Sequence, residues 1–221
     1  MPGRRVSETV RRSQIIKAAY RVAAVNGLGG LTVRRVAAKA RVSTGLVLFH
    51  FRTKDQLIVA LLDWLLDTTT VLHVGNDIAR IPSSLDRLLA LLRQEMDRLS
   101  SEPQRIRLFF DFWALGIRDA GIRRKMRREL VRYRDAFRPM AAEVLRAEPD
   151  RFARVTADGL AAVAVSFIKG CAVQSMIDPE RFDIAEYLAA TQGLVGQLAS
   201  ATGAQPRRAT RRRNASVSTT R

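Results

Sequence analysis

Apolar residues recur along most of the chain at intervals of three and four, which is the spacing of one face of an α-helix. The first such series is Ile15, Ile16, Ala19, Val22 and Ala23. Stretches of strict apolar–polar alternation, which would indicate strands, are nearly absent. Asn26-Gly27 and Gly29-Gly30 follow a helical run, so they predict a helix C-terminus rather than a hairpin. The sequence therefore predicts an all-α fold.

The N-terminal segment divides into three predicted helices. The first covers about residues 7–26. Thr32 is placed to cap a short second helix over Val33–Ala40, and Ser43 is placed to cap a third that runs to about His50. Two short helices joined by about four residues are typical of a helix-turn-helix, in which the second of the pair enters the DNA major groove.

Two stretches of the remaining chain have the form of a capping box, in which a serine or threonine and a glutamine three residues later bracket a helix start. Thr53-Lys54-Asp55-Gln56 predicts a long fourth helix, and Ser101-Glu102-Pro103-Gln104 predicts a helix with Glu102 and Pro103 in its first turn. The helices expected after the third cover residues 53–78, 85–99, 104–118, 122–147, 156–177 and 183–200.

Positive charge is concentrated at the two ends of the chain. The 221 residues have a formal net charge of +17. Residues 1–54 contain twelve lysines and arginines and a single acid, Glu8, while residues 201–221 contain six arginines and no acid. Residues 55–200 contain equal numbers of basic and acidic side chains. A general bias toward arginine codons would have given this segment an excess of positive charge as well. The distribution favours a polyanion-binding module at the N-terminus.

Several classes of protein are disfavoured by what the sequence contains. A single cysteine, Cys171, excludes an intramolecular disulfide and suits the reducing cytoplasm. The polar N-terminus predicts no secretory signal. The longest apolar stretches are interrupted by Asp63 and Lys169, so we expect no membrane span and no membrane partner. Metal-ligand spacings, phosphate-binding loops and nucleophile elbows do not occur, so we predict no enzyme, no metal and no cofactor.

Residues 31–57 resemble the N-terminal domain of the tetracycline-repressor (TetR) family. The shared features are a threonine-capped second helix, Val-Ser before the third, an aromatic-His-Phe ending, and Thr-Lys-Asp-x-Leu at the start of the fourth. Residues 170–179 resemble, more weakly, the C-terminal domain of the betaine/choline-regulator branch. We therefore expect a helix-turn-helix domain over residues 1–52, a ligand-binding and dimerisation domain over 53–200, and a disordered basic tail over 201–221.

The resemblance assigns DNA contacts to individual residues. It implies that Thr32 and Lys54 bind phosphates at helix N-termini, where free N–H groups and the helix dipole favour an anion. It implies a phosphate contact for His50 and base or backbone contacts along the third helix. With the helix cap and neighbouring arginines included, the predicted DNA-binding set is Thr32, Arg34, Arg35, Arg41, Ser43, Thr44, Gly45, Leu46, Leu48, Phe49, His50 and Lys54.

The third helix departs from the family pattern in ways that limit how it reads DNA. Arg41 stands where the family has glycine, which would cost about 1–2 kcal/mol in a left-handed backbone, and Leu48 stands where it has tyrosine. The helix contains no Arg, Lys, Asn or Gln for bidentate base contacts. Readout would use Thr44, the backbone at Gly45, and apolar contact of Leu46 or Leu48 with thymine methyl groups.

Two alternatives stay open for these residues. Leu46, Leu48 and Phe49 are also compatible with ordinary core packing, although Val42, Val47 and Phe51 already supply an inward face. The second-helix arginines, which would add phosphate affinity and base contacts, are also compatible with a solvated basic face.

The last two predicted helices suit a homodimer interface. Their apolar stripes lie among small residues, which let helices approach closely. The stripe residues are Leu160, Val163, Ala164, Phe167, Cys171 and Gln174, followed by Leu188, Thr191, Leu194, Val195 and Leu198. The alternative is that these stripes pack only within one subunit. One short reading helix covers too few base pairs for specificity, which also favours a two-fold dimer.

Aromatic residues cluster on more than one side of the helix over 104–118, which predicts that neighbouring helices bury it and suggests a sensing pocket. The candidate ligand-binding residues are Trp64, Met96, Phe109, Phe110, Trp113, Met126, Tyr133, Phe137 and Phe167. Core packing also explains most of these aromatics. Asp111 is either an acid facing a cationic ligand or, as its spacing from Arg107 favours, a surface residue.

Together these features predict a dimeric transcriptional regulator, most simply a repressor released from a palindromic operator by an unidentified small molecule. The helix over 53–78 would carry the movement, because it would touch both domains. The tail would add a sequence-independent phosphate contribution, or no contribution at all. The alternative function is a nucleoid-coating or ligand-storage protein.

Overall fold

The computed structural model describes residues 7–69 and 72–197. This part of the chain contains ten α-helices and no strand, which confirms the all-α prediction. The helices are α1 Glu8–Asn26, α2 Val33–Ala40, α3 Thr44–Phe51, α4 Lys54–Asp67, α5 Asn76–Ala79, α6 Ser84–Ser101, α7 Pro103–Arg118, α8 Ala120–Ala147, α9 Ala157–Ile177 and α10 Ile184–Gln197. The predicted tail over 201–221 lies outside the described residues.

The helix caps predicted for α2, α3 and α4 form as expected. The side-chain oxygens of Thr32, Ser43 and Thr53 each accept a hydrogen bond from the backbone N–H three residues later, at 3.1–3.2 Å. Arg41, which ends α2, has φ 55° and ψ 48°, so the family's glycine position is left-handed here as well. Local sequence therefore sets the helix-turn-helix geometry, including one strained residue.

The fourth helix is shorter than predicted: it ends at Asp67 rather than near residue 78. Thr68 and Thr69 donate their hydroxyl groups back to the carbonyls of Trp64 and Leu65, at 2.7 and 2.6 Å. Arg105 of α7 also donates to the Leu65 carbonyl, at 2.9 Å. These bonds satisfy the terminal carbonyls that a longer helix would have used.

The capping box expected at Ser101 does not form. Ser101 is the last residue of α6, and its hydroxyl donates to the Arg98 carbonyl at 2.7 Å. Glu102 precedes α7 without a side-chain cap, and Pro103 is the first helical residue. A proline at this position needs no partner for an N–H, so α7 begins without the predicted serine cap.

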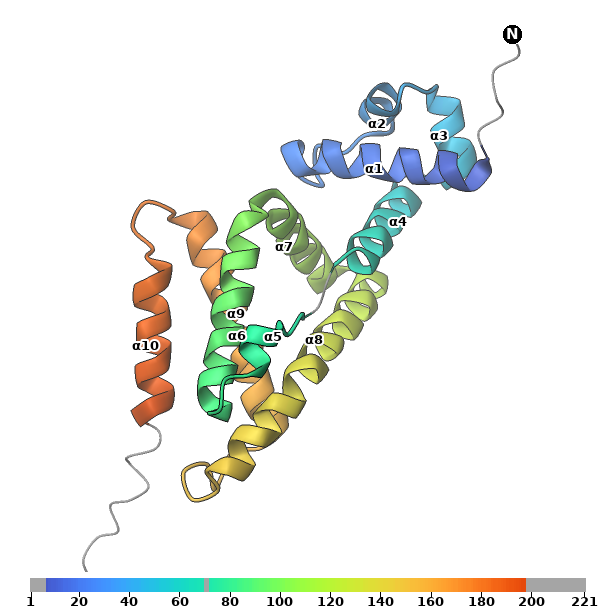
Figure 1. The fold of residues 1–221 in the computed structure, drawn as a ribbon. Coiled ribbons are helices and arrows are strands. Elements are labelled where there is room, and N and C mark those ends of the chain that lie inside the picture. Colours follow the sequence, from blue (N-terminus) through green and yellow to red (C-terminus); the bar gives the residue numbers. More distant parts are fainter. Residues whose placement is uncertain (1–6, 70–71, 198–221) are drawn as a thin grey trace, which may run out of the picture.

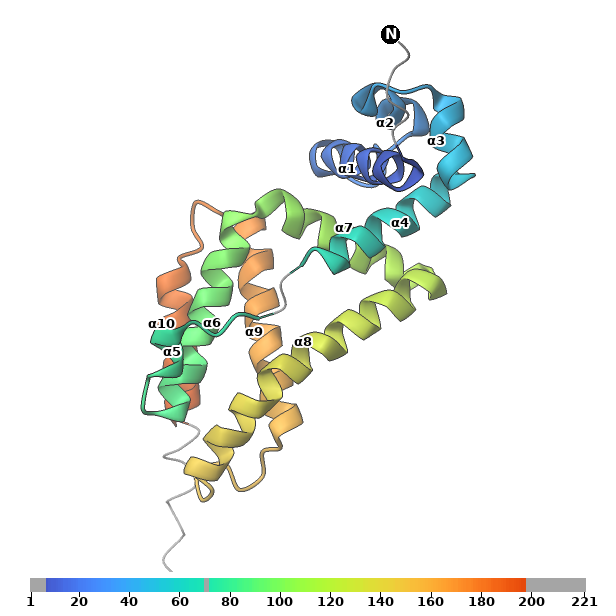
Figure 2. The same cartoon turned by 45° about the vertical axis from the view of Figure 1, so that its right-hand side comes forward.

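Helices α1–α3 form a head at one end of the molecule, and α4 leads from it into the body formed by α5–α10 (Figure 1). The longest helix, α8, has 28 residues and runs diagonally from beside α4 to the far end of the body (Figure 2). Helix α9 packs against α6 and α8, and α10 packs against α9 and α6.

Two clusters of buried apolar side chains hold these parts together. The body cluster lies among α6, α8 and α9. The head cluster joins α1–α4 and continues into the body, because Phe109 and Phe112 of α7 and Met126 of α8 belong to it. Helix α7 also packs directly on α1. The head is therefore connected to the body through α7 as well as through α4.

Helix α9 is long and apolar enough, by length and composition alone, to cross a membrane. In this fold it is a core helix, since it packs against α6, α7, α8 and α10. Its buried face is formed by Leu160, Ala161, Ala164, Val165, Ile168, Cys171 and Ala172. Lys169, which interrupts its apolar sequence, faces the pocket described below.

Candidate DNA-reading head and ligand pocket

Helix α3 presents one face to the surface of the head and the other to its core. Val47 and Phe51 are fully buried, whereas Leu48 is 42% and Phe49 is 73% exposed. Thr44 and Gly45 are exposed. Leu48 and Phe49 therefore do not serve as core residues, which was the alternative left open by the sequence.

The position of α3 is fixed by an arginine that the sequence did not single out. The Arg12 guanidinium lies over the Phe51 ring, 4.3 Å from its centroid, and its Nη1 donates to the His50 carbonyl at 2.8 Å. This contact ties the C-terminus of α3 to the start of α1. Arg11 and Arg12 are adjacent in the sequence of α1, so the sequence gave no signal that Arg12 in particular contacts α3.

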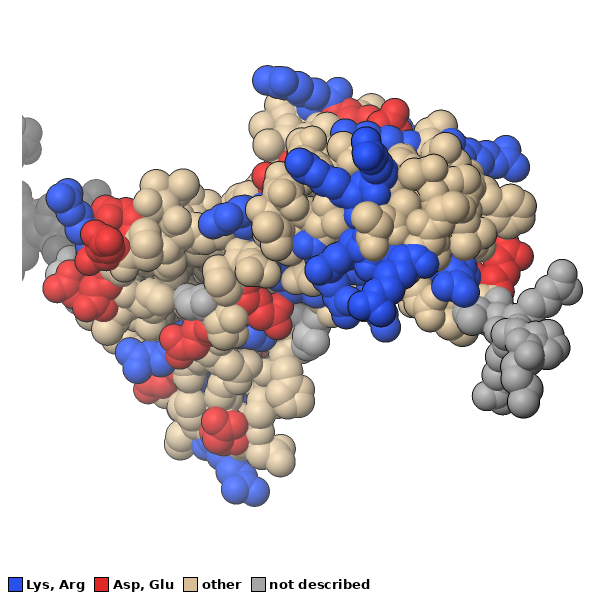
Figure 3. Space-filling view, turned by 90° about the horizontal axis from the view of Figure 1, so that it is seen from above, with Lys and Arg blue, Asp and Glu red and all other residues tan. Residues whose placement is uncertain are grey.

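Leu46 and His50 also lie on α3, where both are half-buried. The other predicted DNA-binding residues lie at the start of α2, along it, in the turn after it and at the start of α4. Arg34, Arg41 and Lys54 are exposed at these sites. Arg35 is exposed too, but its Nη1 donates to the Gly30 carbonyl at 2.9 Å, so this guanidinium is turned toward the α1–α2 connection. Figure 3, which looks down on the molecule from the head side, shows lysines and arginines gathered over the head.

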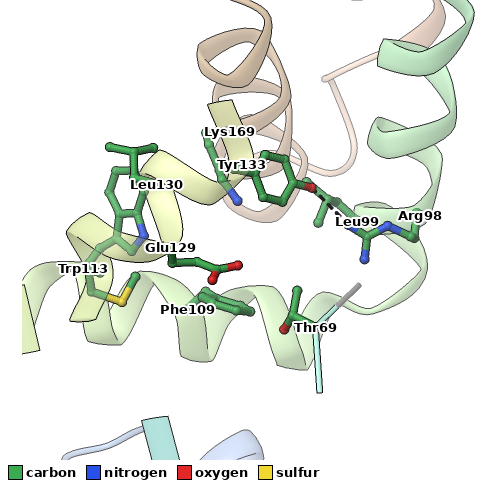
Figure 4. A pocket seen from close by; sticks show the side chains of 10 residues that line it. Thr69, Arg98, Leu99, Phe109, Trp113, Glu129, Leu130, Tyr133 and Lys169 are labelled. Atoms are coloured by element: carbon green, nitrogen blue, oxygen red, sulfur yellow. Dashed lines mark hydrogen bonds between the residues drawn. The ribbon is translucent and has the colours of Figure 1, made fainter. Parts of the chain in front are cut away.

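The body contains a pocket among α6, α7, α8 and α9 (Figure 4). Four of the predicted ligand-binding residues line it: Phe109, Trp113, Met126 and Tyr133. Its other lining residues are Thr69, Arg98, Leu99, Glu129, Leu130 and Lys169. The space inside is about 20 Å³, which is room for about one water molecule, so a larger ligand requires side chains to move.

The other five predicted ligand-binding residues do not line this pocket. Met96 and Phe137 are buried in the body cluster, and Phe110 packs against it. Trp64 packs on Tyr20, with ring centroids 5.1 Å apart. Phe167 packs on Tyr187, with centroids 6.3 Å apart. Core packing, the alternative given for these aromatics, accounts for all five.

A polar network that the sequence did not predict forms one side of the pocket. Tyr133 donates its hydroxyl to Glu95 Oε2 at 2.5 Å, and Arg98 Nη2 donates to the same oxygen at 2.6 Å and to the Tyr133 hydroxyl at 3.0 Å. Glu95 is only 1% exposed. Burial, followed by the nearby Glu95 carboxylate, raises the pKa of Tyr133, so its proton stays in place.

Lys169 projects into the pocket from α9. Its Nζ lies 4.7 Å from the centroid of the Tyr133 ring and 5.9 Å from that of Phe109. Burial, with repulsion from Arg98, lowers the pKa of Lys169 to about 8. Burial also raises the pKa of Glu129, whose Oε1 is buried without a hydrogen-bond partner. The only signal in the sequence was a lysine within an apolar stretch.

Asp111 takes neither of its two predicted roles. Its Oδ2 accepts a hydrogen bond at 3.0 Å from the backbone N–H of Leu28, in the turn that follows α1. The neighbouring Gly27 has φ +67°, and a Cβ there would lie 3.3 Å from the same oxygen. The carboxylate therefore fastens α7 to the head at a turn that favours glycine.

Comparison with known proteins agrees with both parts of the molecule. Residues 15–61 match the TetR family of bacterial regulatory proteins, and residues 84–200 match the C-terminal domain of BetI-type transcriptional repressors. The chain belongs to the TetR family. The regulator is 30% identical over 154 residues to the HTH-type transcriptional regulator BetI of Burkholderia ambifaria, across 70% of this chain and 78% of that one.

Solved structures of other regulators share the fold. A transcriptional regulator from Rhodococcus superposes with a TM-score of 0.67 at 22% identity, covering 88% of this chain and 99% of the other. A regulator from Saccharomonospora viridis in complex with choline superposes with a TM-score of 0.66 at 14% identity, covering 86% and 97%. This TetR-family protein is a DNA-binding transcriptional regulator, and its family is not enzymatic. The predictions of a DNA-binding regulator and of a protein without enzymatic activity are therefore confirmed.

Proposed function

We propose that this TetR-family regulator is a dimeric, cytoplasmic repressor that binds a palindromic operator and releases it when a small molecule enters the body pocket. The observation that carries this proposal is the exposed face of α3, on which Phe49 is 73% and Leu48 is 42% exposed on a basic head. Such side chains on a globular domain mark a contact surface. Thr44, Gly45 and Leu46 would read bases beside them.

The outward faces of α9 and α10 support a dimer interface there. Val163 is 46%, Ile177 is 80% and Leu194 is 57% exposed. The inward residues of the two predicted stripes are instead buried within the subunit, as the alternative expected, so only the outward residues would contact a second copy; the inward residues are Leu160, Ala164, Cys171, Leu188 and Thr191. Leu198 and the side chain of Val195 lie outside the described part of the chain. A second copy would cover the exposed apolar residues.

Helix α7 offers a route from pocket to head. It carries Phe109 and Trp113 in the pocket wall and Asp111 on the Leu28 N–H. A ligand that displaces Trp113 would shift α7 and so move the head. The two heads would then no longer match successive major grooves, about 34–36 Å apart. The loss of operator affinity equals the ligand's preference for the shifted state.

Selection of bound duplexes from a random pool tests this function. We expect enrichment of a palindrome with two half-sites about one helical turn apart, and protection of both half-sites in a footprint. A footprint without two symmetric half-sites would favour the alternative of a nucleoid-coating or ligand-storage protein.

We propose that the tail over residues 201–221 adds non-specific phosphate contacts through its six arginines. Removing it should reduce the dependence of affinity on salt while leaving the preferred sequence unchanged. A changed preferred sequence would contradict this role.

A further inference from the structure

One cation of the pocket has no carboxylate within ion-pair distance. Glu95 pairs with Arg98, with Oε2 and Nη2 2.6 Å apart. Glu129 lies beside Arg132, with Oε2 and Nη1 3.4 Å apart. Within the described ranges, Lys169 has no ion pair or hydrogen bond: its ammonium lies over two aromatic rings, and the carboxylates of Glu129 and Glu95 attract it from beyond ion-pair distance. The Lys169 ammonium therefore lacks a direct ion-pair partner in the pocket.

That ammonium already occupies the position that a cationic ligand would take. A cation bound among aromatic side chains lies within about 6 Å of ring centroids. Lys169 Nζ fills this position against Tyr133 and Phe109, at 4.7 and 5.9 Å. A second cation would have to displace the lysine and would be repelled by it in a poorly solvated site. The pocket therefore disfavours the binding of a quaternary ammonium group.

The apolar wall of the pocket continues outward into a groove between α7 and α8. Trp113, Met126 and Leu130 line both spaces, and the groove has a volume of about 380 Å³. Its rim carries Arg123, Arg127 and Arg134. Between residues 123 and 134 the chain has seven basic side chains and one acid. A mouth with this charge attracts anions and repels cations.

We propose that the effector is an amphipathic carboxylate, whose anionic group pairs with the Lys169 ammonium and whose apolar chain extends past Trp113 and Leu130 into the α7–α8 groove. This inference rests on the proposed function, because it takes this pocket to be the effector site. It differs from the cation seen in the choline complex of the Saccharomonospora viridis regulator.

Glu129 fits this arrangement as a hydrogen-bond donor. Its Oε1 is buried and has no partner, and burial raises the pKa of the carboxyl group. A ligand carboxylate held by Lys169 would favour the protonated form of Glu129, which can then donate a hydrogen bond to that carboxylate. Trp113 and Leu130 lie together at one side of the pocket (Figure 4) and also line the groove, so their movement would open a path for the chain.

Two probes with similar apolar chains and oppositely charged head groups test the proposal: decanoate and decyltrimethylammonium. Their binding is measured by titration calorimetry on the full-length protein, on Lys169→Met, on Lys169→Arg and on Arg154→Met. Arg154 is exposed in the turn between α8 and α9, so its substitution controls for the loss of one positive charge. Denaturant unfolding of each variant checks the fold.

We expect wild type and Arg154→Met to bind decanoate at least tenfold more tightly than decyltrimethylammonium. Lys169→Met should lose at least tenfold in decanoate affinity and gain affinity for the ammonium probe, and Lys169→Arg should keep the preference for decanoate. Tighter binding of the ammonium probe to wild type, no binding of decanoate, or unchanged decanoate affinity in Lys169→Met would overturn the proposal.

Operator binding, measured separately on a selected duplex, distinguishes this failure from failure of the proposed function. A protein that prefers the ammonium probe and releases operator with it is still a ligand-responsive repressor, with a different effector class. A protein that binds decanoate through Lys169 but holds its operator unchanged has the proposed ligand class and lacks the proposed response.

Discussion

The Asp111 carboxylate accepts a hydrogen bond at 3.0 Å from the backbone N–H of Leu28, which joins two residues 83 positions apart in the sequence. Asp111 belongs to α7, between the pocket residues Phe109 and Trp113, while Leu28 belongs to the turn between α1 and α2. A displacement of α7 by a ligand would thereby be passed directly to the head. This contact makes α7, in addition to α4, the element that we expect to carry the response.

Replacing Asp111 with alanine should weaken this coupling. A hydrogen bond to a charged group contributes about 1.5–3 kcal/mol, and partial exposure of Asp111 places the expected loss in unfolding free energy at the lower end. Operator affinity without ligand should change little, while the loss of affinity caused by decanoate should shrink severalfold. Anisotropy titrations with and without decanoate measure both.

Asp111→Asn is the matched control, because its amide oxygen can still accept from Leu28. It should retain most of the response. Full ligand response in Asp111→Ala would show that the signal reaches the head by another route, such as the Lys125–Asp63 ion pair between α8 and α4, with Nζ and Oδ1 2.5 Å apart.

Phe49 should matter for DNA binding and little for folding. Since its side chain is 73% exposed, Phe49→Ala should change the unfolding free energy by less than about 0.5 kcal/mol. Operator affinity should fall at least tenfold. Val25→Ala is the control, because Val25 is 72% exposed and lies near the C-terminal end of α1, whereas α3 contacts the N-terminal end of that helix. This substitution should leave operator affinity unchanged. Equal effects of the two substitutions would contradict the placement of α3 on DNA.

Substitutions of Lys54 and Thr44 should have different effects on DNA binding. Lys54→Ala removes the phosphate contact proposed at the start of α4, so it should weaken binding to all duplexes alike and lower the salt dependence by about one counter-ion. Thr44→Ala should instead alter which sequences are selected. Selection from a random pool with each variant separates the two effects, and unchanged selectivity in Thr44→Ala would refute its reading role.

Arg41 stores backbone strain, because it adopts φ 55° and ψ 48° at the end of α2. Arg41→Gly should relieve it and raise the unfolding free energy by about 1 kcal/mol, after allowance for the greater freedom of glycine in the unfolded chain. Arg41→Ala loses the same charge but keeps a Cβ, so it should show no such gain in urea unfolding. Similar stability of both variants would argue against strain at this position.

Lys169 should make stability depend on pH. Its pKa falls from 10.5 in the unfolded chain to about 8 in the folded protein, so the folded state binds fewer protons between these values. The destabilisation is full below about pH 8 and disappears as the pH rises to about 10.5. Lys169→Met should therefore exceed wild type in unfolding free energy by up to about 3 kcal/mol at pH 7.

That difference should narrow as the pH rises from 8 to 10.5, and denaturant unfolding of both proteins across this range measures it. Comparison with the variant removes contributions from other titrating groups. A constant difference across the range would mean that Lys169 is as well solvated as a surface lysine.

Most features that neighbouring residues set were predictable from the sequence. The caps at Thr32, Ser43 and Thr53 depend on a few adjacent positions and form as expected. The equally local capping box at Ser101 does not form, because α6 continues through Ser101. The end of α4 was not predictable, because Arg105, which lies 40 residues beyond Leu65, helps to satisfy its last carbonyls.

The pocket was only partly predictable for the same reason. Phe109 and Phe110 are adjacent aromatics, yet Phe109 lines the pocket and Phe110 packs against the body cluster, since they point to different sides of α7. Glu95, Tyr133 and Lys169 come from α6, α8 and α9, and periodicity within one helix does not show which residues of different helices meet. The division of the chain at residues 52 and 53 stays a prediction.

The most direct test is an anisotropy competition between a selected palindromic duplex and a shuffled duplex of the same composition, at an ionic strength of about 0.15 M. A sequence-reading head should prefer the palindrome by about a thousandfold or more. Equal affinity for the two duplexes would contradict operator recognition by α3.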